Sequence, residues 1–310
     1  SHVEIAGFHM LPARGRWMKL TSATYCTVRD CVMEKARDWG GVRCEDCHYN
    51  RYVGNVVRRG GGVSKWGHTG GNMWNNNNCS HCVFERNHFS RVGHCPLNFM
   101  RESPYNIVRG NIFDCRWGRN FEFFSTPRAL IEGNIITNGF DGSGSADGRA
   151  KLFVIGGSFG RNVIHRNAYG ALIINSYHYK GFPAPFSMAR SRLYNNTWYR
   201  NHDHGFEMSD LGKDPDPHYV TGNVFANNIF FDNDPGGGHL SLLLWGNIAD
   251  DNRWLSNAIC GDAPGRKTIR YDTPGDSLNT WPGLMMTAEE ANTEKPDQFE
   301  GNLDVAPMFR

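Results

Sequence analysis

Basic and phenolic side chains in this sequence are of the types that remove a proton beside a carboxylate. That chemistry requires a cation to neutralise the carboxylate, a base to take the proton, and an acid to protonate the leaving oxygen. The sequence predicts these roles for Lys151 as base, Tyr179 or His178 as proton donor, and Arg101 or Arg43 as the cation. A lysine base needs a lowered pKa, which burial or a nearby arginine would supply and an adjacent carboxylate would oppose.

A second set of residues suits the binding of a sugar chain. Aromatic rings pack against the C–H faces of sugars, while amides and charged groups fix their polar substituents. The residues predicted to contact substrate are Lys19, Arg43, Trp74, Asn98, Asn120, Glu122, Phe153, Asn175 and Glu207. The competing interpretation is that the aromatic members pack beneath loops.

Hydrolysis of a glycosidic bond would need different residues. It uses two carboxyl groups about 5 to 9.5 Å apart. Glu122 and Glu207 are predicted to stand three strands apart, or roughly 14 Å at the usual strand spacing. They form a poor pair unless Asp210 or an aspartate of a loop joins one of them.

A recurring asparagine indicates the elements that must position these residues. It follows an apolar residue by three positions and precedes another apolar residue. The instances are Asn55, Asn87, Asn111, Asn134, Asn167, Asn196, Asn228 and Asn257, with Cys31 and Gly7 at the equivalent earlier places. The steps from 7 to 257 are 24, 24, 32, 24, 23, 33, 29, 32 and 29 residues. A period in the twenties with occasional insertions is typical of a solenoid.

The residue types within each period indicate which solenoid this is. Short runs of Val, Ile, Phe and Tyr, broken by Gly and Asn, predict strands and turns rather than helices. Stacked asparagine side chains form hydrogen-bonded ladders. With these repeats the chain resembles the right-handed parallel β-helix proteins of the pectin-lyase-like superfamily over residues 3–260. The resemblance implies an all-β solenoid of about ten coils. It leaves the activity open, since the class holds lyases, hydrolases, epimerases, tailspikes and adhesins.

Each period also contains a second apolar-alternating run, such as Val42 to Cys44 and Met73 to Asn75. The outer residues of each triple are predicted to point inward, so that the middle residue faces solvent. Insertions at 60–71, 141–148 and 177–183 flank these runs and predict the walls of a cleft. We expect residues 1–260 to form the β-helix and residues 261–310 a loop-rich extension with a partial last coil.

Nine cysteines include the paired motifs Cys44-x-x-Cys47 and Cys79-x-x-Cys82, whose spacing is that of zinc ligands. Cys44 is predicted to point into the core and Cys79 to lie too far away to share a metal. Buried free thiols are therefore the favoured interpretation. No cofactor is expected. Asp141 and Asp147 are weak calcium candidates, because their Gly/Ser-rich loop lacks the usual ligand arrangement.

The net charge of +2 is unevenly distributed. Residues 1–118 hold 16 Lys and Arg against 9 Asp and Glu, which gives +7, and the remainder holds 17 against 22, which gives −5. The basic part favours an anionic partner, although arginines that only decorate the edges of coils would give the same count. We expect an anionic polysaccharide as partner, and neither nucleic acid nor a membrane span.

Three functions follow as hypotheses: β-elimination on an acidic polysaccharide, glycoside hydrolysis on the same scaffold, and non-catalytic glycan binding by an adhesin or tailspike-like module. The sequence contains no recognisable secretory signal, and an extracellular or periplasmic location is expected from the predicted substrate. It does not indicate the sugar or the oligomeric state.

Overall fold

A computed structural model describes most of the chain. The described residues are 2–11, 16–35, 41–60, 73–92, 95–100, 103–114, 122–124, 126–139, 151–153, 158–167, 173–175, 188–202, 204–209, 220–235, 240–245, 251–271 and 283–308. Their contacts group them into two units, unit 1 (Ser1–Ala150) and unit 2 (Lys151–Arg310).

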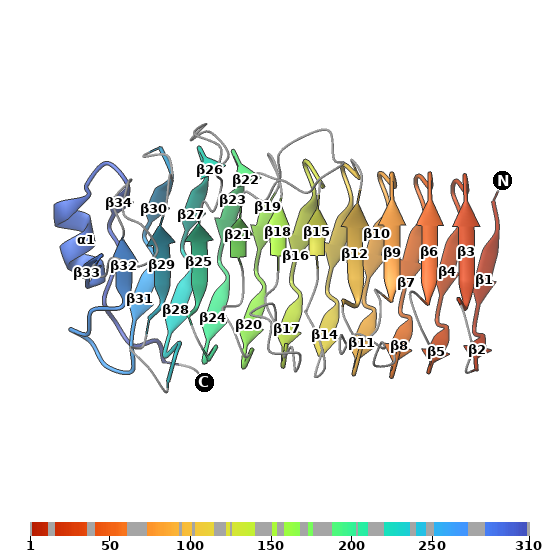
Figure 1. Ribbon diagram of the computed structural model, residues 1–310, viewed down its shortest axis with the longest axis horizontal. Helices are drawn as coiled ribbons and strands as arrows, with labels where there is room; N and C mark the ends of the chain where they lie inside the picture. Colours follow the sequence, from red (N-terminus) through yellow and green to blue (C-terminus); the bar gives the residue numbers. More distant parts are fainter. Residues whose placement is uncertain are drawn as a thin grey trace. The chain divides into compact units, whose positions relative to one another are not determined.

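Unit 1 consists of three parallel sheets, and within each sheet a strand pairs with the strand that comes three strands later in the sequence (Figure 1). The first sheet contains β1 (Glu4–Ala6), β4 (Thr27–Arg29), β7 (Arg51–Val53), β10 (Val83–Glu85), β13 (Ile107–Arg109) and β16 (Leu130–Glu132). The second contains β2 (His9–Met10), β5 (Val32–Glu34), β8 (Val56–Arg58), β11 (His88–Ser90), β14 (Ile112–Asp114) and β17 (Ile135–Thr137). The third contains β3 (Met18–Thr21), β6 (Val42–Glu45), β9 (Trp74–Asn77), β12 (Leu97–Met100) and β15 (Glu122–Phe124).

Unit 2 repeats this order. Its first sheet contains β19 (Ser158–Gly160), β23 (Arg192–Tyr194), β27 (Val224–Ala226), β30 (Arg253–Leu255) and β34 (Phe299–Glu300), and its second contains β20 (Val163–His165), β24 (Thr197–Tyr199), β28 (Ile229–Phe231) and β31 (Ala258–Cys260). Its third contains β18 (Lys151–Phe153), β21 (Ile173–Asn175), β25 (Phe206–Ser209), β29 (Leu242–Trp245), β32 (Ile269–Tyr271) and the antiparallel β33 (Leu284–Met286). A small sheet pairs β22 (Met188–Ala189) with β26 (Val220–Thr221), and α1 (Ala288–Glu294) precedes β34.

This arrangement is the right-handed parallel β-helix that the sequence predicted. The strand series that begins with β1 and ends with β34 has eleven members, close to the ten coils expected. The predicted domain division at residue 260 stays a prediction. Residues beyond it supply β32, β33, α1 and β34, of which β34 pairs in parallel with β30.

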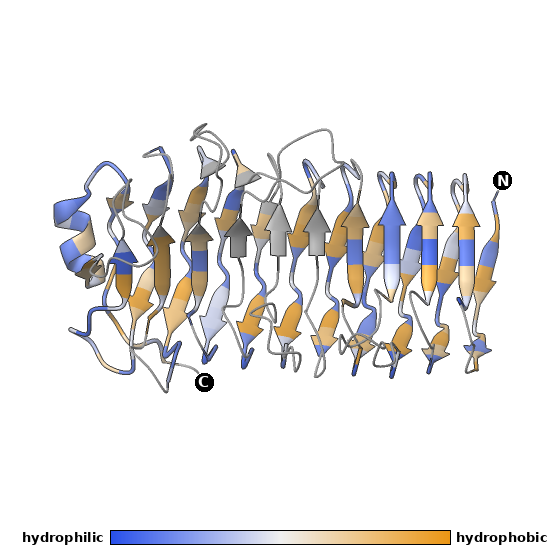
Figure 2. Ribbon diagram, viewed as in Figure 1, coloured by the Kyte–Doolittle hydropathy of each residue, from blue (hydrophilic) through white to orange (hydrophobic). Residues whose placement is uncertain are grey.

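Three-residue strands with an apolar centre explain the core. In unit 1 the central residues of the first sheet, such as Val28, Tyr52 and Phe84, are fully buried. The central residues of the second sheet, such as Val57 and Phe89, are buried as well. Side chains alternate along a strand, so each centre points inward while its two neighbours point outward. Figure 2 shows apolar colour recurring on strand after strand.

Aromatic rings stack along the core of unit 2. Trp254 lies 3.9 Å from Phe225 between ring centroids, at an interplanar angle of 7°, and 5.9 Å from Phe299. Trp198 stacks on Phe230 at 4.5 Å. Parallel, in-register strands place equivalent residues of successive coils above one another, and large rings in these places bury extensive apolar area.

The asparagine ladder forms at the turn between the first and second sheets. In unit 1 the series is Asn55, Asn87, Asn111 and Asn134, and the Nδ2 atom of each of the first three donates to Oδ1 of the next member at 3.0 Å. In unit 2 the equivalent series is Asn162, Asn196, Asn228, Asn257 and Asn302. The expectation of a ladder is thus confirmed for all of the eight recurring asparagines except Asn167.

Asn167 is the exception, and its predicted place is wrong. It follows β20 rather than β19 and belongs to a separate ladder with Asn201 and Asn233 at the next corner. The residue before each ladder asparagine carries the left-handed backbone, for example Arg86 at φ 53° and Gly110 at φ 61°. The asparagines themselves serve as hydrogen-bonding groups rather than as left-handed turn residues.

The cysteines of both paired motifs lie in the core of unit 1. Cys44, Cys47, Cys79 and Cys82 are free thiols with no exposed surface, as predicted for Cys44. Burial raises the pKa of the Cys44 thiol, which stays protonated in this setting. Among the described residues, no three His, Cys, Asp or Glu side chains converge to hold a metal ion. No described helix is long and apolar enough to cross a membrane.

Replacing Asn111 with Ala should destabilise unit 1 by roughly 1 to 3 kcal/mol, because it leaves buried polar groups unpaired. The Asn111 amide accepts from the backbone N–H of Asn87 at 2.9 Å and donates to the carbonyl of Phe84 at 2.9 Å. Urea denaturation measures the change in unfolding free energy. Asn78→Gly is the control, because Asn78 is exposed, its φ of 50° suits glycine, and its amide bonds only an exposed carboxylate. Equal stability of the two variants would contradict a buried ladder.

Candidate functional site

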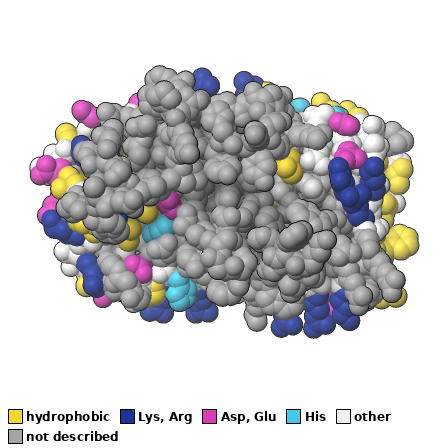
Figure 3. Space-filling view, viewed as in Figure 1, with side chains coloured by type: hydrophobic (Ala, Val, Ile, Leu, Met, Phe, Trp, Pro, Cys, Tyr) yellow, Lys and Arg dark blue, Asp and Glu magenta, His cyan; other side chains and the backbone are white. Residues whose placement is uncertain are grey.

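Polar side chains form an outward column on the third sheet of unit 1. Parallel pairing places Lys19, Arg43, Asn75 and Asn98 at the same register position on β3, β6, β9 and β12. Glu45 and Asn77 occupy the next outward position, two residues further along their strands. Figure 3 shows basic and acidic side chains side by side near the N-terminal coils.

Glu45 is the electrostatic centre of this column. Its carboxylate lies 3.1 Å from Lys19 Nζ and also pairs with Arg43. The hydrogen bond from Lys19, with that from Arg43, lowers the pKa of Glu45, so the carboxylate is ionised at neutral pH. One negative charge therefore faces two positive charges. Arg43 Nε and Asn75 Oδ1 are buried and have no hydrogen-bond partner among the described residues.

The structure corrects the predicted place of Trp74. Trp74 pairs in register with Val42 and Leu97, which are inward residues, and its ring is fully buried between Tyr52 and Phe84. Asn75 takes the outward place instead. The register moved by one because Asn76 points inward, where its Nδ2 donates to the Asn98 carbonyl at 3.1 Å. A polar residue at an inward position hides the alternation on which the prediction depended.

Two further predicted contacts differ in detail. Asn98 lies in the predicted column but is only 1% exposed, which removes it from the accessible surface. Phe153 does not occupy the middle register position predicted for it. Lys151 occupies that position, since it pairs with Ile173, which in turn pairs with Glu207.

Unit 2 places a buried histidine beside a buried glutamate on its third sheet. Phe206 and Met208 of β25 point into the core, so Glu207 points outward, in register with Leu243 of β29. His204 precedes β25, and its Nε2 lies 3.0 Å from Glu207 Oε2. Their side chains are 2% and 4% exposed. A carboxylate at this distance stabilises the imidazolium that forms when the ring takes up a proton.

Sequence reasoning singled out Glu207 and missed His204. A histidine three residues before a glutamate, in a chain that turns through Gly205 into a strand, was the available signal. The sequence alone could not indicate that a side chain of the preceding corner reaches back to a strand residue.

Several predicted residues lie outside the described part of the chain: Arg101, Asn120, Asp141, Asp147, His178 and Tyr179. The predicted cleft walls at 60–71, 141–148 and 177–183 lie outside it too, apart from Gly60. Glu122, Lys151, Phe153 and Asn175 lie in strands β15, β18, β18 and β21, and only their backbone positions are described. Their predicted roles stay predictions.

Comparisons with solved structures find similar chain courses among carbohydrate-active proteins. One is the catalytic domain of a GH87 α-1,3-glucanase in complex with nigerose, with 10% identity, a TM-score of 0.45, and coverage of 96% of this chain and 56% of that one. Another is a mannuronic acid specific polysaccharide family 6 lyase from human gut microbiota, with 12% identity, a TM-score of 0.44, and coverage of 98% and 78%. A third is the A-module of a mannuronan C-5 epimerase from Azotobacter vinelandii, with 12% identity, a TM-score of 0.36, and coverage of 83% and 80%.

No protein-family model and no curated protein matches this sequence. The chain spans about half the length of the glucanase domain. At these identities the structural similarities concern the fold, and they assign no activity to this chain.

A double-mutant cycle on His204 and Glu207 should give a coupling free energy of about 1 to 3 kcal/mol, because the pair is buried and each partner orients the other. The variants are His204→Gln, Glu207→Gln and the combination, and urea denaturation measures their stability. The matched control is the exposed pair Arg253 and Glu300, whose atoms lie 2.8 Å apart and whose coupling should stay below about 1 kcal/mol. Equal coupling in the two pairs would mean that His204 and Glu207 do not act on each other.

Proposed function

We propose that this protein cleaves an acidic polysaccharide by β-elimination on the outer face of its third sheet. The observation that carries the proposal is the buried His204–Glu207 pair, in which the imidazole Nε2 lies 3.0 Å from the carboxylate of an outward strand residue. Such a pair can take a proton and hold the resulting positive charge.

The proposed step begins with removal of the proton on the carbon next to the sugar carboxylate. His204 takes this proton, and Glu207 stabilises the imidazolium. The C–O bond to the neighbouring sugar then breaks with its electron pair, a carbon–carbon double bond forms, and a proton donor protonates the departing oxygen. No water is consumed. Tyr179 or His178 remains the proposed donor.

A cation must neutralise the sugar carboxylate to acidify that proton. Lys151 shares the register column of Glu207, two strands away, or about 10 Å along the sheet. We therefore propose Lys151 for carboxylate binding and His204, in place of Lys151, as the base, because Glu207 lies 3.0 Å from the His204 imidazole and would stabilise its protonated form. Arg43 and Arg101 belong to unit 1, and they remain proposed cations for a sugar carboxylate bound by that unit.

Burial of the pair sets a condition on this mechanism. With 2% and 4% of their side chains exposed, His204 and Glu207 meet a substrate only if the chain that covers them opens. The same cover would exclude water from the reaction, which strengthens electrostatic effects.

Hydrolysis is less well supported. Hydrolysis needs a pair of carboxyl groups. Glu207 is the one Asp or Glu within the third-sheet strands of unit 2, which are β18, β21, β25, β29, β32 and β33. Non-catalytic glycan binding is the second candidate, favoured by the Lys19, Arg43 and Asn75 column of unit 1. The proposal also includes an anionic polysaccharide as partner and an extracellular location. It keeps Asp141 and Asp147 as candidate calcium ligands.

Incubation with a panel of acidic and neutral polysaccharides should yield unsaturated uronate ends from an acidic member, seen as new ultraviolet absorbance. His204→Gln should lower turnover by about 10²- to 10⁴-fold, the usual contribution of a general base. Arg253→Ala, which removes an exposed ion pair, should leave turnover unchanged. New reducing ends without unsaturation would indicate hydrolysis instead, and binding without any product would indicate an adhesin. Full activity of a folded His204→Gln variant would place the base elsewhere.

A further inference from the structure

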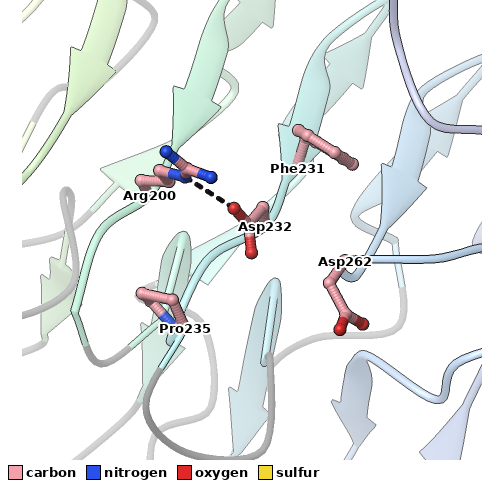
Figure 4. Close-up of a pocket in the computed structure, with 5 residues that line it drawn as sticks. All are labelled: Arg200, Phe231, Asp232, Pro235 and Asp262. Carbon is pink, nitrogen blue, oxygen red and sulfur yellow. Dashed lines mark hydrogen bonds and ion pairs between the residues drawn. The ribbon is translucent and has the colours of Figure 1, made fainter.

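A pocket of about 550 Å³ lies in unit 2 at the corner that follows the second sheet, and its size is within the range of small-molecule sites. It is lined by Arg200, Phe231, Asp232, Pro235 and Asp262 (Figure 4). These residues follow the ends of β24, β28 and β31. None of these five described residues is a proposed catalytic residue.

Arg200 is held in place on two sides. Its Nε donates to Asp232 Oδ2 at 2.7 Å, and its guanidinium carbon lies 5.2 Å from the centre of the Tyr199 ring. No described residue accepts a hydrogen bond from its two terminal nitrogens, and the side chain is 52% exposed. The guanidinium is thus fixed before any ligand arrives, and its two terminal nitrogens can donate in parallel to a ligand.

The charges of the pocket cancel locally. Asp232 is only 10% exposed in its side chain and neutralises Arg200, while Asp262 pairs with Arg266 at 2.6 Å. An anionic ligand would gain little from Arg200 and would meet the carboxylates of Asp232 and Asp262. A neutral ligand with several hydroxyl groups would face no such repulsion.

Apolar and polar walls occur together. Phe231, stacked on Tyr199 at 5.8 Å, and Pro235 offer apolar surface. Asp262 offers an accepting carboxylate that is 47% exposed. A fixed pair of donors, an acceptor and an apolar wall match the hydroxyl edge and the C–H face of a sugar ring.

We propose that this pocket binds a neutral pyranose unit, with adjacent hydroxyl groups accepting from Arg200, one hydroxyl donating to Asp262, and the C–H face against Phe231. The proposal does not depend on any cleavage reaction. Arg200 and His204 are four residues apart, so their Cα atoms lie within about 14 Å. A sugar in the pocket would therefore lie near the proposed reacting centre.

Ligand-observed saturation-transfer NMR on the whole chain tests the pocket, with maltose, mannobiose and galactobiose as neutral probes and digalacturonate as the acidic probe. At least one neutral disaccharide should bind. Arg200→Ala should weaken its binding by roughly 10- to 150-fold, the usual effect of losing hydrogen bonds to a charged group, and Asp262→Ala by about 2- to 10-fold, because the half-exposed carboxylate of Asp262 competes with water.

Arg253→Ala is the matched control, since Arg253 is also a half-exposed, ion-paired arginine of unit 2 and should retain parental affinity. Arg200→Ala leaves the largely buried Asp232 unpaired, so Asp262→Ala, whose target is half exposed, serves as the variant that keeps the fold. Binding of digalacturonate alone would overturn the proposal. So would the absence of saturation transfer to any neutral probe, or neutral binding that survives both substitutions. Each result is independent of whether His204→Gln abolishes cleavage.

Discussion

The hydrogen bond between the buried amide of one coil and the asparagine of the next is the interaction on which the structure depends. A parallel β-helix turns sharply after every three or four strand residues, and each turn buries backbone groups that need partners. Each ladder asparagine satisfies two backbone groups of the coil before it. The Asn87 amide, for example, accepts from the Asn55 N–H at 3.0 Å and donates to the Tyr52 carbonyl at 2.9 Å. In-register stacking follows from this constraint.

In-register stacking in turn creates columns of side chains, and the columns decide what the surface can do. Inward columns hold the stacked rings and the buried thiols. Outward columns bring together residues far apart in sequence, such as Lys19, Arg43 and Glu45, or Glu207 and Leu243. Because neighbouring strands lie about 4.8 Å apart, like charges in one column repel and call for a carboxylate between them. Glu45 has this place in unit 1, and Glu85 has a similar one among Arg51, Arg86 and Arg109.

The sequence allowed the fold to be predicted because the ladder asparagine has one physical role and recurs with it. The prediction was wrong at Asn167 for the same reason. A second corner of each coil also uses a ladder asparagine, and its spacing in the sequence overlaps with that of the first corner. Trp74 was misplaced because Asn76 is a polar residue in the core, an exception that alternation cannot reveal. The candidate site was less predictable. The His204 side chain comes from a corner rather than a strand, and the pocket at Arg200 arises from three successive coils whose corner residues share no motif.

The central claim is that sugar chemistry takes place at His204 on the third sheet of unit 2. A crystal structure of the Glu207→Gln variant soaked with an oligouronate tests it most directly. The claim predicts a uronate unit against β25, with a ring nitrogen of His204 about 3 to 3.5 Å from the carbon that bears the abstracted proton. An oligouronate bound elsewhere on the molecule, with His204 still covered, would contradict it.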